Sequence, residues 1–160
     1  MANEKIAVFP GSFDPITIGH VNIVKRSALL FDKVIIALGN NTKKQYTFDF
    51  DQRKKWIDAI FVDHDNVEVM AYKGLTVNFA RDVGARYLIR GIRNSSDFEY
   101  EKTIAQLNKS MMPEVETICI ISEPELTHIS STIVKEILIN DGDVSKFLPK
   151  EVYQNISDKL

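Results

Sequence analysis

Three stretches of the sequence combine cations, hydroxyls and glycine in an order that suits phosphate groups. The first is PGSFDPITIGH, residues 10–20, directly after a short apolar run. Its Thr17-x-Gly19-His20 spacing puts a hydroxyl and an imidazole at the start of a helix, where the helix dipole favours phosphate. Taken alone, this pattern also fits a histidine that only caps the helix.

The second stretch is YLIRGIRNSSDFEYE, residues 87–101, in which Arg90 and Arg93 flank a glycine at the end of a predicted strand. A buried guanidinium group is costly unless it meets an anion, and its planar fork suits phosphate oxygens. The pair therefore predicts a phosphate site. For Asp97 and Glu99 we prefer a structural role at the helix start, and for Arg53 we expect a surface ion pair.

The third stretch is ELTHISSTIVKEIL, residues 125–138, in which Ser130, Ser131 and Thr132 open a helix. One hydroxyl is expected to cap that helix. Three in a row exceed what capping needs, and with the free backbone N–H groups they predict a cradle for phosphates. Lys44, in NNTKKQYTF after the second apolar run, either reaches an incoming phosphate or is ordinary surface charge.

The elements that position these stretches alternate along the chain. Apolar, β-branched runs predict strands at residues 6–9, 34–38, 67–70, 87–89 and 117–121, and amphipathic segments between them predict helices. This order predicts an α/β fold, a single Rossmann-like doubly wound domain over residues 1–160 with a five-stranded parallel sheet. Ligands in such sheets bind beyond the carboxyl ends of the strands, where all three stretches fall.

Several local signals mark the expected helix ends. Asp49 with Gln52 and Ser96 with Glu99 resemble capping boxes, Gly84 suits the residue after a helix, and Pro149 suits the first residue of a final helix.

The composition and charge of the chain exclude some classes of protein. The net charge of −2 gives no broad basic field, so nucleic acid is not an expected partner. No apolar run approaches the length of a membrane span, and the N-terminus carries no apolar signal core. Cys119, the single cysteine, lies in an apolar run and is interpreted as a small buried hydrophobe. These features predict a cytoplasmic protein.

The whole string PGSFDPITIGH, together with Arg90-Gly91-Ile92-Arg93 and Ile129-Ser130-Ser131-Thr132, resembles the phosphopantetheine adenylyltransferases of the nucleotidyltransferase superfamily. The resemblance covers nearly the whole chain. It implies adenylyl transfer from ATP to 4′-phosphopantetheine, giving dephospho-coenzyme A and pyrophosphate by in-line attack, without a covalent enzyme intermediate. Leu126 departs from the aromatic residue that members often carry, and Lys135 replaces the arginine of many superfamily relatives.

The resemblance also implies roles for individual residues. Its catalytic residues would be His20, Lys44 and Arg93. The phosphopantetheine-binding residues would be Ser12, Lys44, Thr76 and Arg90. The ATP-binding residues would be Ser12, Phe13, His20, Gly91, Ile92, Arg93, Glu101, Leu126, Thr127, His128, Ile129, Ser130, Ser131 and Thr132, with His128 contributing only through its backbone. Mg²⁺ would be held mainly through substrate phosphates and by no dedicated protein ligand. A homohexamer and feedback binding of coenzyme A are further expectations.

Two alternatives stay open at this point. A related adenylyl- or cytidylyltransferase could act on nicotinate mononucleotide or an alcohol phosphate, although Pro10-Gly11 and Thr17 differ from the usual nicotinate pattern. A nucleotide sensor without catalysis would be expected to lack His20 or the three hydroxyls, and the chain has both.

Overall fold

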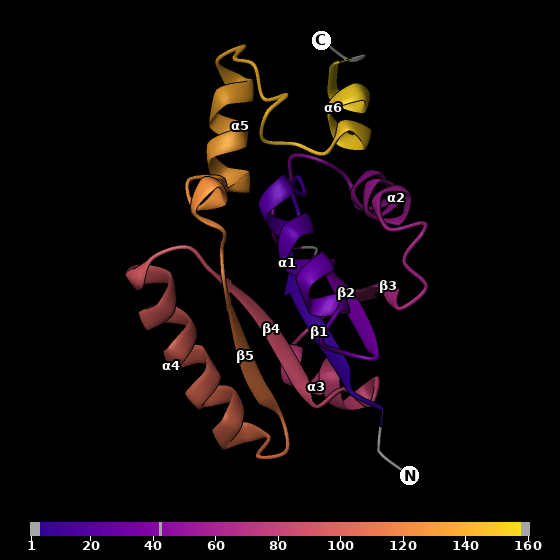
Figure 1. Cartoon of the computed structure of the whole chain (residues 1–160), viewed down its shortest axis with the longest axis vertical. Helices are drawn as coiled ribbons and strands as arrows, with labels where there is room; N and C mark the ends of the chain where they lie inside the picture. Colours follow the sequence, from indigo (N-terminus) through magenta and orange to yellow (C-terminus); the bar gives the residue numbers. More distant parts are fainter. Residues whose placement is uncertain (1–3, 42, 158–160) are drawn as a thin grey trace.

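Five short apolar segments form a parallel sheet in the order β3-β2-β1-β4-β5 (Figure 1). The computed structural model describes residues 4–41 and 43–157. Its strands are β1 (Ile6–Gly11), β2 (Lys33–Gly39), β3 (Val67–Tyr72), β4 (Tyr87–Ile92) and β5 (Glu116–Ile121). Its helices are α1 (Ile18–Ala28), α2 (Phe50–Ile60), α3 (Thr76–Asp82), α4 (Ser95–Met111), α5 (Ser131–Ile139) and α6 (Lys150–Ser157), with a 3₁₀ turn, η1 (Pro124–Leu126), before α5.

The sheet separates two hydrophobic clusters, because successive side chains of a strand point to opposite faces. Along β1, Ala7 and Phe9 join the larger cluster with residues of α1, α2, α5 and α6, while Val8 joins the smaller one with α3 and the end of α4. Figure 1 shows α4 along β4 and β5, and α6 beside α2. The predicted doubly wound α/β fold with a five-stranded parallel sheet is confirmed, and the predicted domain bounds of 1–160 extend beyond the described residues.

The structure changes some of the predicted strand and helix boundaries and keeps others. Strand β4 extends through Arg90 and Gly91, which pair with Cys119 and Ile120 of β5. The capping box predicted at Ser96 is wrong, because Asn94 caps α4 by accepting a hydrogen bond from the Asp97 N–H at 2.9 Å. Asp49 caps α2 by accepting from the Gln52 N–H, but the return bond from the Gln52 side chain that would complete the predicted capping box is absent between these two described residues. Gly84 follows α3, as predicted. Its φ is +73°, a backbone conformation that residues other than glycine rarely adopt.

The interpretation of Cys119 as buried is wrong. Strand β5 lies at the edge of the sheet, and both Cys119 and Ile121 are exposed. An apolar strand at an edge is covered on both faces only if another element packs there, and the described part of this chain supplies none over these two residues. None of the described helices is long and apolar enough to cross a membrane.

The strand order reverses at β1, since β2 follows on one side and β4 lies on the other. The carboxyl ends of β1 and β4 therefore diverge into the loops that carry the phosphate-type residues.

Candidate active site

A cleft of about 370 Å³ opens at the carboxyl ends of β1 and β4 and against the start of α5. It gathers residues from all three stretches singled out in the sequence and from the lysine loop. The predicted site residues that line it are Ser12, Phe13, His20, Lys44, Arg90, Gly91, Arg93, Glu101, Leu126, Ile129, Ser130, Ser131 and Thr132.

His20 lies in the first turn of α1 and takes part in a capping box. The hydroxyl of Thr17 accepts from the His20 N–H, and the His20 Nδ1 accepts from the Thr17 N–H at 3.0 Å. The imidazole thus occupies the place that glutamate or glutamine usually takes in this motif. Because Nδ1 acts as an acceptor, the neutral ring carries its proton on Nε2. The cap and a role in the cleft are therefore compatible.

The surroundings keep this imidazole neutral at physiological pH. Burial, followed by the positive charges of Arg93 and Arg90, lowers the pKa of His20 from 6.5 to about 4. The ring packs edge-on against Phe13, with ring centroids 5.2 Å apart. His20 can therefore offer an Nε2–H hydrogen bond to an anion without first carrying a full charge.

Gly11 is needed because of Phe13. A Cβ atom at Gly11 would meet the ring of Phe13 at 2.9 Å. Phe13 is buried, has φ of 46°, and packs against Phe9 as well as His20. Packing of Phe13 under the loop therefore favours glycine at position 11.

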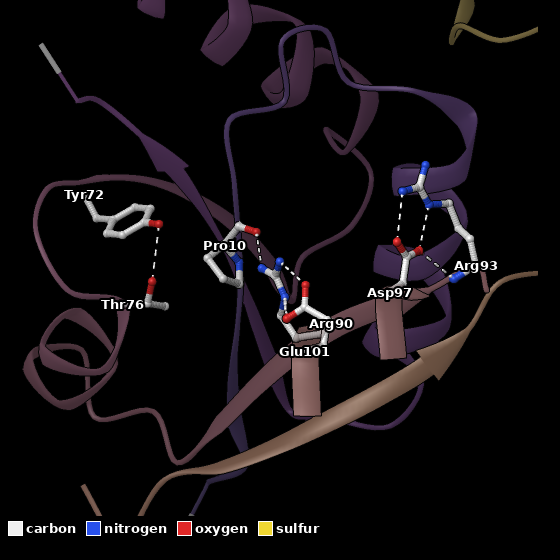
Figure 2. Close-up of polar contacts among 7 residues, drawn as sticks. All are labelled: Pro10, Tyr72, Thr76, Arg90, Arg93, Asp97 and Glu101. Carbon is white, nitrogen blue, oxygen red and sulfur yellow. Dashed lines mark hydrogen bonds and ion pairs between the residues drawn. The ribbon is translucent and has the colours of Figure 1, made fainter. Parts of the chain in front are cut away.

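Both arginines of the Arg90–Arg93 stretch are already paired with carboxylates of α4 (Figure 2). Arg90 donates two hydrogen bonds to Glu101, at 2.8 and 2.6 Å, and a third to the Pro10 carbonyl at 3.2 Å. This bidentate pair, with Glu101 almost fully buried, fixes the guanidinium plane at the junction of β1 and β4.

Arg93 is held by Asp97, one helical turn farther along the chain. The Asp97 carboxylate accepts from the backbone N–H, Nε and Nη2 of Arg93, at 3.0, 2.9 and 3.2 Å. Burial raises the pKa of Asp97, but the hydrogen bonds and charge of Arg93 outweigh it and hold that pKa below its usual range. The purely structural role expected for Asp97 is too narrow, because this carboxylate lines the cleft and orients Arg93. The four-residue spacing was the available signal.

Lys44, in the segment after β2, also lines the cleft. Its ammonium group donates to the Ser12 hydroxyl at 2.8 Å, a neutral partner. Within the described residues, the other cleft cations meet carboxylates: Arg90 meets Glu101, Arg93 meets Asp97, and Lys135 lies 3.5 Å from Asp14. Lys44 is exposed, as its interpretation as surface charge requires, and it also lines the cleft, so its role toward a phosphate stays a prediction.

The three hydroxyls at the start of α5 have different partners. Ser130 is the N-cap and accepts from the Ile133 N–H at 3.2 Å, as one hydroxyl was predicted to do. Ser131 donates to the Pro15 carbonyl at 2.8 Å and so ties α5 to the first loop. All three residues line the cleft together with the helix start, an arrangement suited to an anion.

Four predicted site residues lie elsewhere. Thr76 lines a second cleft of about 170 Å³, which shares Pro10, Arg90 and Glu101 with the first. The Thr76 hydroxyl lies 3.4 Å from the Tyr72 hydroxyl (Figure 2). The side chains that line neither cleft are those of Ile92, Thr127 and His128.

Two residues were missed or misjudged: Arg53, which lies outside the cleft walls, and Asp14, which lines the cleft. Arg53 was expected to form a surface ion pair, but its side chain is buried and donates to backbone carbonyls, because three loops converge over it. Asp14 is also buried and accepts from the N–H groups of Thr47 and Phe48, at 2.9 Å each. No sequence pattern signals either contact, since the partners are backbone atoms 5 to 41 residues away.

The cleft contains three carboxylates, and each is already engaged by a cation. Among the described residues, no group of three or more His, Cys, Asp or Glu side chains is arranged to hold a metal ion. A divalent cation in this cleft would therefore depend on oxygens that a phosphate ligand brings.

Comparisons with known proteins agree on the family. The family model described as Cytidylyltransferase-like matches residues 8–137. A protein named phosphopantetheine adenylyltransferase from Cytophaga hutchinsonii is 53% identical over 93% of this chain and 99% of its own length. Another of that name from Latilactobacillus sakei is 48% identical over 98% of this chain and 96% of its own length.

A solved structure supports the fold. A protein from Vibrio parahaemolyticus, described as a "Putative Nicotinate-nucleotide Adenylyltransferase", superposes with a TM-score of 0.75 over 98% of this chain and 94% of its own, at 18% identity. At that identity the likeness concerns the fold alone. The sequence relatives decide the family: this chain is a nucleotidyltransferase and belongs to the phosphopantetheine adenylyltransferase family.

Proposed function

We propose that this chain transfers the adenylyl group of ATP to 4′-phosphopantetheine, giving dephospho-coenzyme A and pyrophosphate. One observation carries the proposal: a single cleft brings together His20, Lys44, Arg90, Arg93 and the start of α5. The name shared by relatives up to 53% identical supports the choice of acceptor.

The proposed reaction is one in-line displacement. An oxygen of the acceptor phosphate forms a bond to the α-phosphorus of ATP while the bond from that phosphorus to the bridging oxygen breaks, and pyrophosphate leaves. No enzyme group becomes covalently attached, so catalysis depends on positioning and on stabilising negative charge. His20 would donate from Nε2 to an α-phosphate oxygen, a role supported by its Nδ1 acting as an acceptor and by its lowered pKa.

The acceptor side of the site consists of Ser12, Lys44, Thr76 and Arg90. Lys44 and Arg90 would hold the nucleophilic phosphate, with Ser12 of the first loop accepting a hydrogen bond from Lys44. Thr76 would contact the pantetheine arm in the second cleft, which adjoins the first through Arg90 and Pro10.

The ATP side uses Arg93 and the helix starts. Arg93 and the Ser130–Thr132 segment would hold the β- and γ-phosphates, with backbone contacts from Gly91 and Ile92. The remaining proposed ATP contacts are Ser12, Phe13, Glu101, Leu126, Thr127, His128 and Ile129, of which Thr127 and His128 would act through backbone groups. The phosphates of ATP must displace the Asp97 carboxylate from Arg93, or bind Arg93 together with that carboxylate.

Mg²⁺ is proposed as the metal, bound through phosphate oxygens, because the cleft carboxylates are committed to Lys135, Arg93 and Arg90. When bound, it would neutralise charge on the triphosphate.

The other proposals concern the whole molecule. The family resemblance implies a homohexamer. Large apolar side chains exposed on α4 and β5 support self-association of the chain, namely Phe98, Tyr100, Leu107, Met111 and Ile121. Light scattering on the purified chain measures the oligomeric state. A single domain, a cytoplasmic location, feedback by coenzyme A and the lack of a nucleic-acid partner stay predictions from the sequence.

A pyrophosphate-release assay with ATP and a panel of acceptors tests the function. The panel contains 4′-phosphopantetheine, nicotinate mononucleotide and glycerol phosphate. We expect release with 4′-phosphopantetheine alone. Release with nicotinate mononucleotide instead would overturn the proposed acceptor, and ATP binding without release in any arm would favour a nucleotide sensor.

A further inference from the structure

Arg53, in the first turn of α2, is a buried charged residue outside the walls of the cleft. Its side chain is 1% exposed. Burial lowers the pKa of Arg53 from its usual value, and the charge of Asp14 opposes that effect. A buried guanidinium group costs free energy that an apolar side chain of similar volume would not. The contacts of Arg53 should therefore show which structural role offsets the cost of burying its guanidinium group.

Those contacts join three separate segments of backbone. Nη1 of Arg53 donates to the Ser12 carbonyl at 2.6 Å and to the Gly39 carbonyl at 3.3 Å. Its Nε donates to the Phe48 carbonyl at 3.0 Å. The first loop, the end of β2 and the segment before α2 thus converge on one guanidinium group. A lysine has a single nitrogen and cannot reproduce this fork.

The contacts continue into the cleft. Arg53 holds the backbone carbonyl of Ser12, while the hydroxyl of the same residue accepts from Lys44 Nζ at 2.8 Å. The ring of Tyr46 contacts both cations, with its centroid 4.0 Å from the Arg53 guanidinium carbon and 5.7 Å from Lys44 Nζ. Arg53, Ser12, Lys44 and Tyr46 therefore form a closed ring of contacts, of which only Ser12 and Lys44 line the cleft.

Asp14 holds part of the same region independently. Its carboxylate accepts from the N–H groups of Thr47 and Phe48. Loss of Arg53 would consequently leave the segment attached to the first loop, while the Ser12 carbonyl, the Gly39 carbonyl and the Tyr46 ring would lose their common partner. The expected effect is misplacement of Ser12 and Lys44.

We propose that Arg53 is a positioning residue that sets Ser12 and Lys44 in place for the acceptor phosphate. This inference rests on the proposed function, which puts Lys44 on the acceptor side. Arg53 touches neither substrate there. Its effect should be larger on the acceptor than on ATP, because Arg53 holds only Ser12 among the proposed ATP contacts, while Arg93 is held by Asp97.

Two variants and one control test the proposal. Arg53→Lys keeps the charge and loses the fork, and Arg53→Met keeps most of the volume and loses both. Lys54→Met is the matched control, since the neighbouring Lys54 is paired with Asp58 on the outer side of α2. Each variant is titrated calorimetrically with 4′-phosphopantetheine and, separately, with ATP. The titrations are done at a temperature below the melting temperature of that variant. For both Arg53 variants we expect the acceptor Kd to rise roughly tenfold or more, and the ATP Kd to stay within about twofold.

A second readout does not depend on the function. Lys43 and Lys44 are exposed in the segment that Arg53 holds, so trypsin cleavage after either one reports how firmly that segment is fixed. We expect faster cleavage there in Arg53→Met and wild-type cleavage in Lys54→Met, with products identified by mass spectrometry.

The outcomes separate the two proposals. If wild-type protein bound no 4′-phosphopantetheine, the proposed function would fail, and faster cleavage in Arg53→Met would still support the positioning role. If folded Arg53 variants bound the acceptor as the wild type does, or lost ATP affinity equally, the positioning role would be wrong. Unchanged cleavage after Lys43 and Lys44 would overturn it as well.

Discussion

Replacing His20 with glutamine separates the two roles that this residue has in the structure. Glutamine is a usual residue at this position of a capping box, so its side-chain oxygen can accept from the Thr17 N–H as Nδ1 does. The variant keeps the cap of α1 and removes the titrating group. The difference in pH dependence between wild type and variant therefore reports the pKa of His20.

The sign and the size of the pH effect on the free energy of unfolding follow from the pKa values of His20 in the folded and the unfolded chain. Unfolding returns His20 from a pKa of about 4 to 6.5, so the unfolded chain binds more protons between these values. Stability is fully present above pH 6.5 and falls as the pH drops toward 4. At about 1.36 kcal/mol per pH unit the upper limit is about 3 kcal/mol, and about 2 kcal/mol should already be lost near pH 5.

Urea unfolding of both proteins near pH 7.5 and near pH 5, at one protein concentration, measures this difference. We expect wild type to lose about 2 kcal/mol more than His20→Gln on acidification. NMR titration of the imidazole nitrogens gives the pKa directly and should show the proton on Nε2 in the neutral ring. Equal losses in both proteins, together with titration of His20 near 6.5, would refute the reasoning that burial and the two arginines depress this pKa.

The other predictions concern separate parts of the structure. His20→Ala should lower kcat by roughly 10²-fold with the fold intact, and near-normal turnover would leave His20 as a cap only. Lys44→Ala should weaken acceptor binding and Arg93→Ala should weaken ATP binding; equal loss of ATP affinity in both, by calorimetry, would contradict a two-sided site. Asn94→Ala should cost about 1 kcal/mol in urea unfolding, because α4 loses its cap. Ile36→Ala, at a fully buried position of β2, should cost about 2–5 kcal/mol, and a cost below about 1 kcal/mol would contradict its packing.

Local patterns were sufficient for the order of the elements and for most of the site. Alternating apolar runs and amphipathic segments predict a doubly wound parallel sheet, because only that arrangement buries both kinds of segment. The sequence indicated that Arg90 and Arg93 meet anions, since two guanidinium groups at a strand end are costly as packing, and in the structure they meet the carboxylates of Glu101 and Asp97. Their role toward phosphate stays a prediction. The topology rule then places the loops after β1 and β4 at one edge.

The tertiary structure alone decided which partners these groups meet. Arg53 has the same sequence surroundings as a surface arginine, and it is buried because the carbonyls of Ser12, Gly39 and Phe48 converge over α2. The exposure of Cys119 likewise depends on what covers the edge strand β5. Contacts of this kind join residues far apart in the chain through backbone atoms, which carry no residue-specific signal, so only the folded chain determines them.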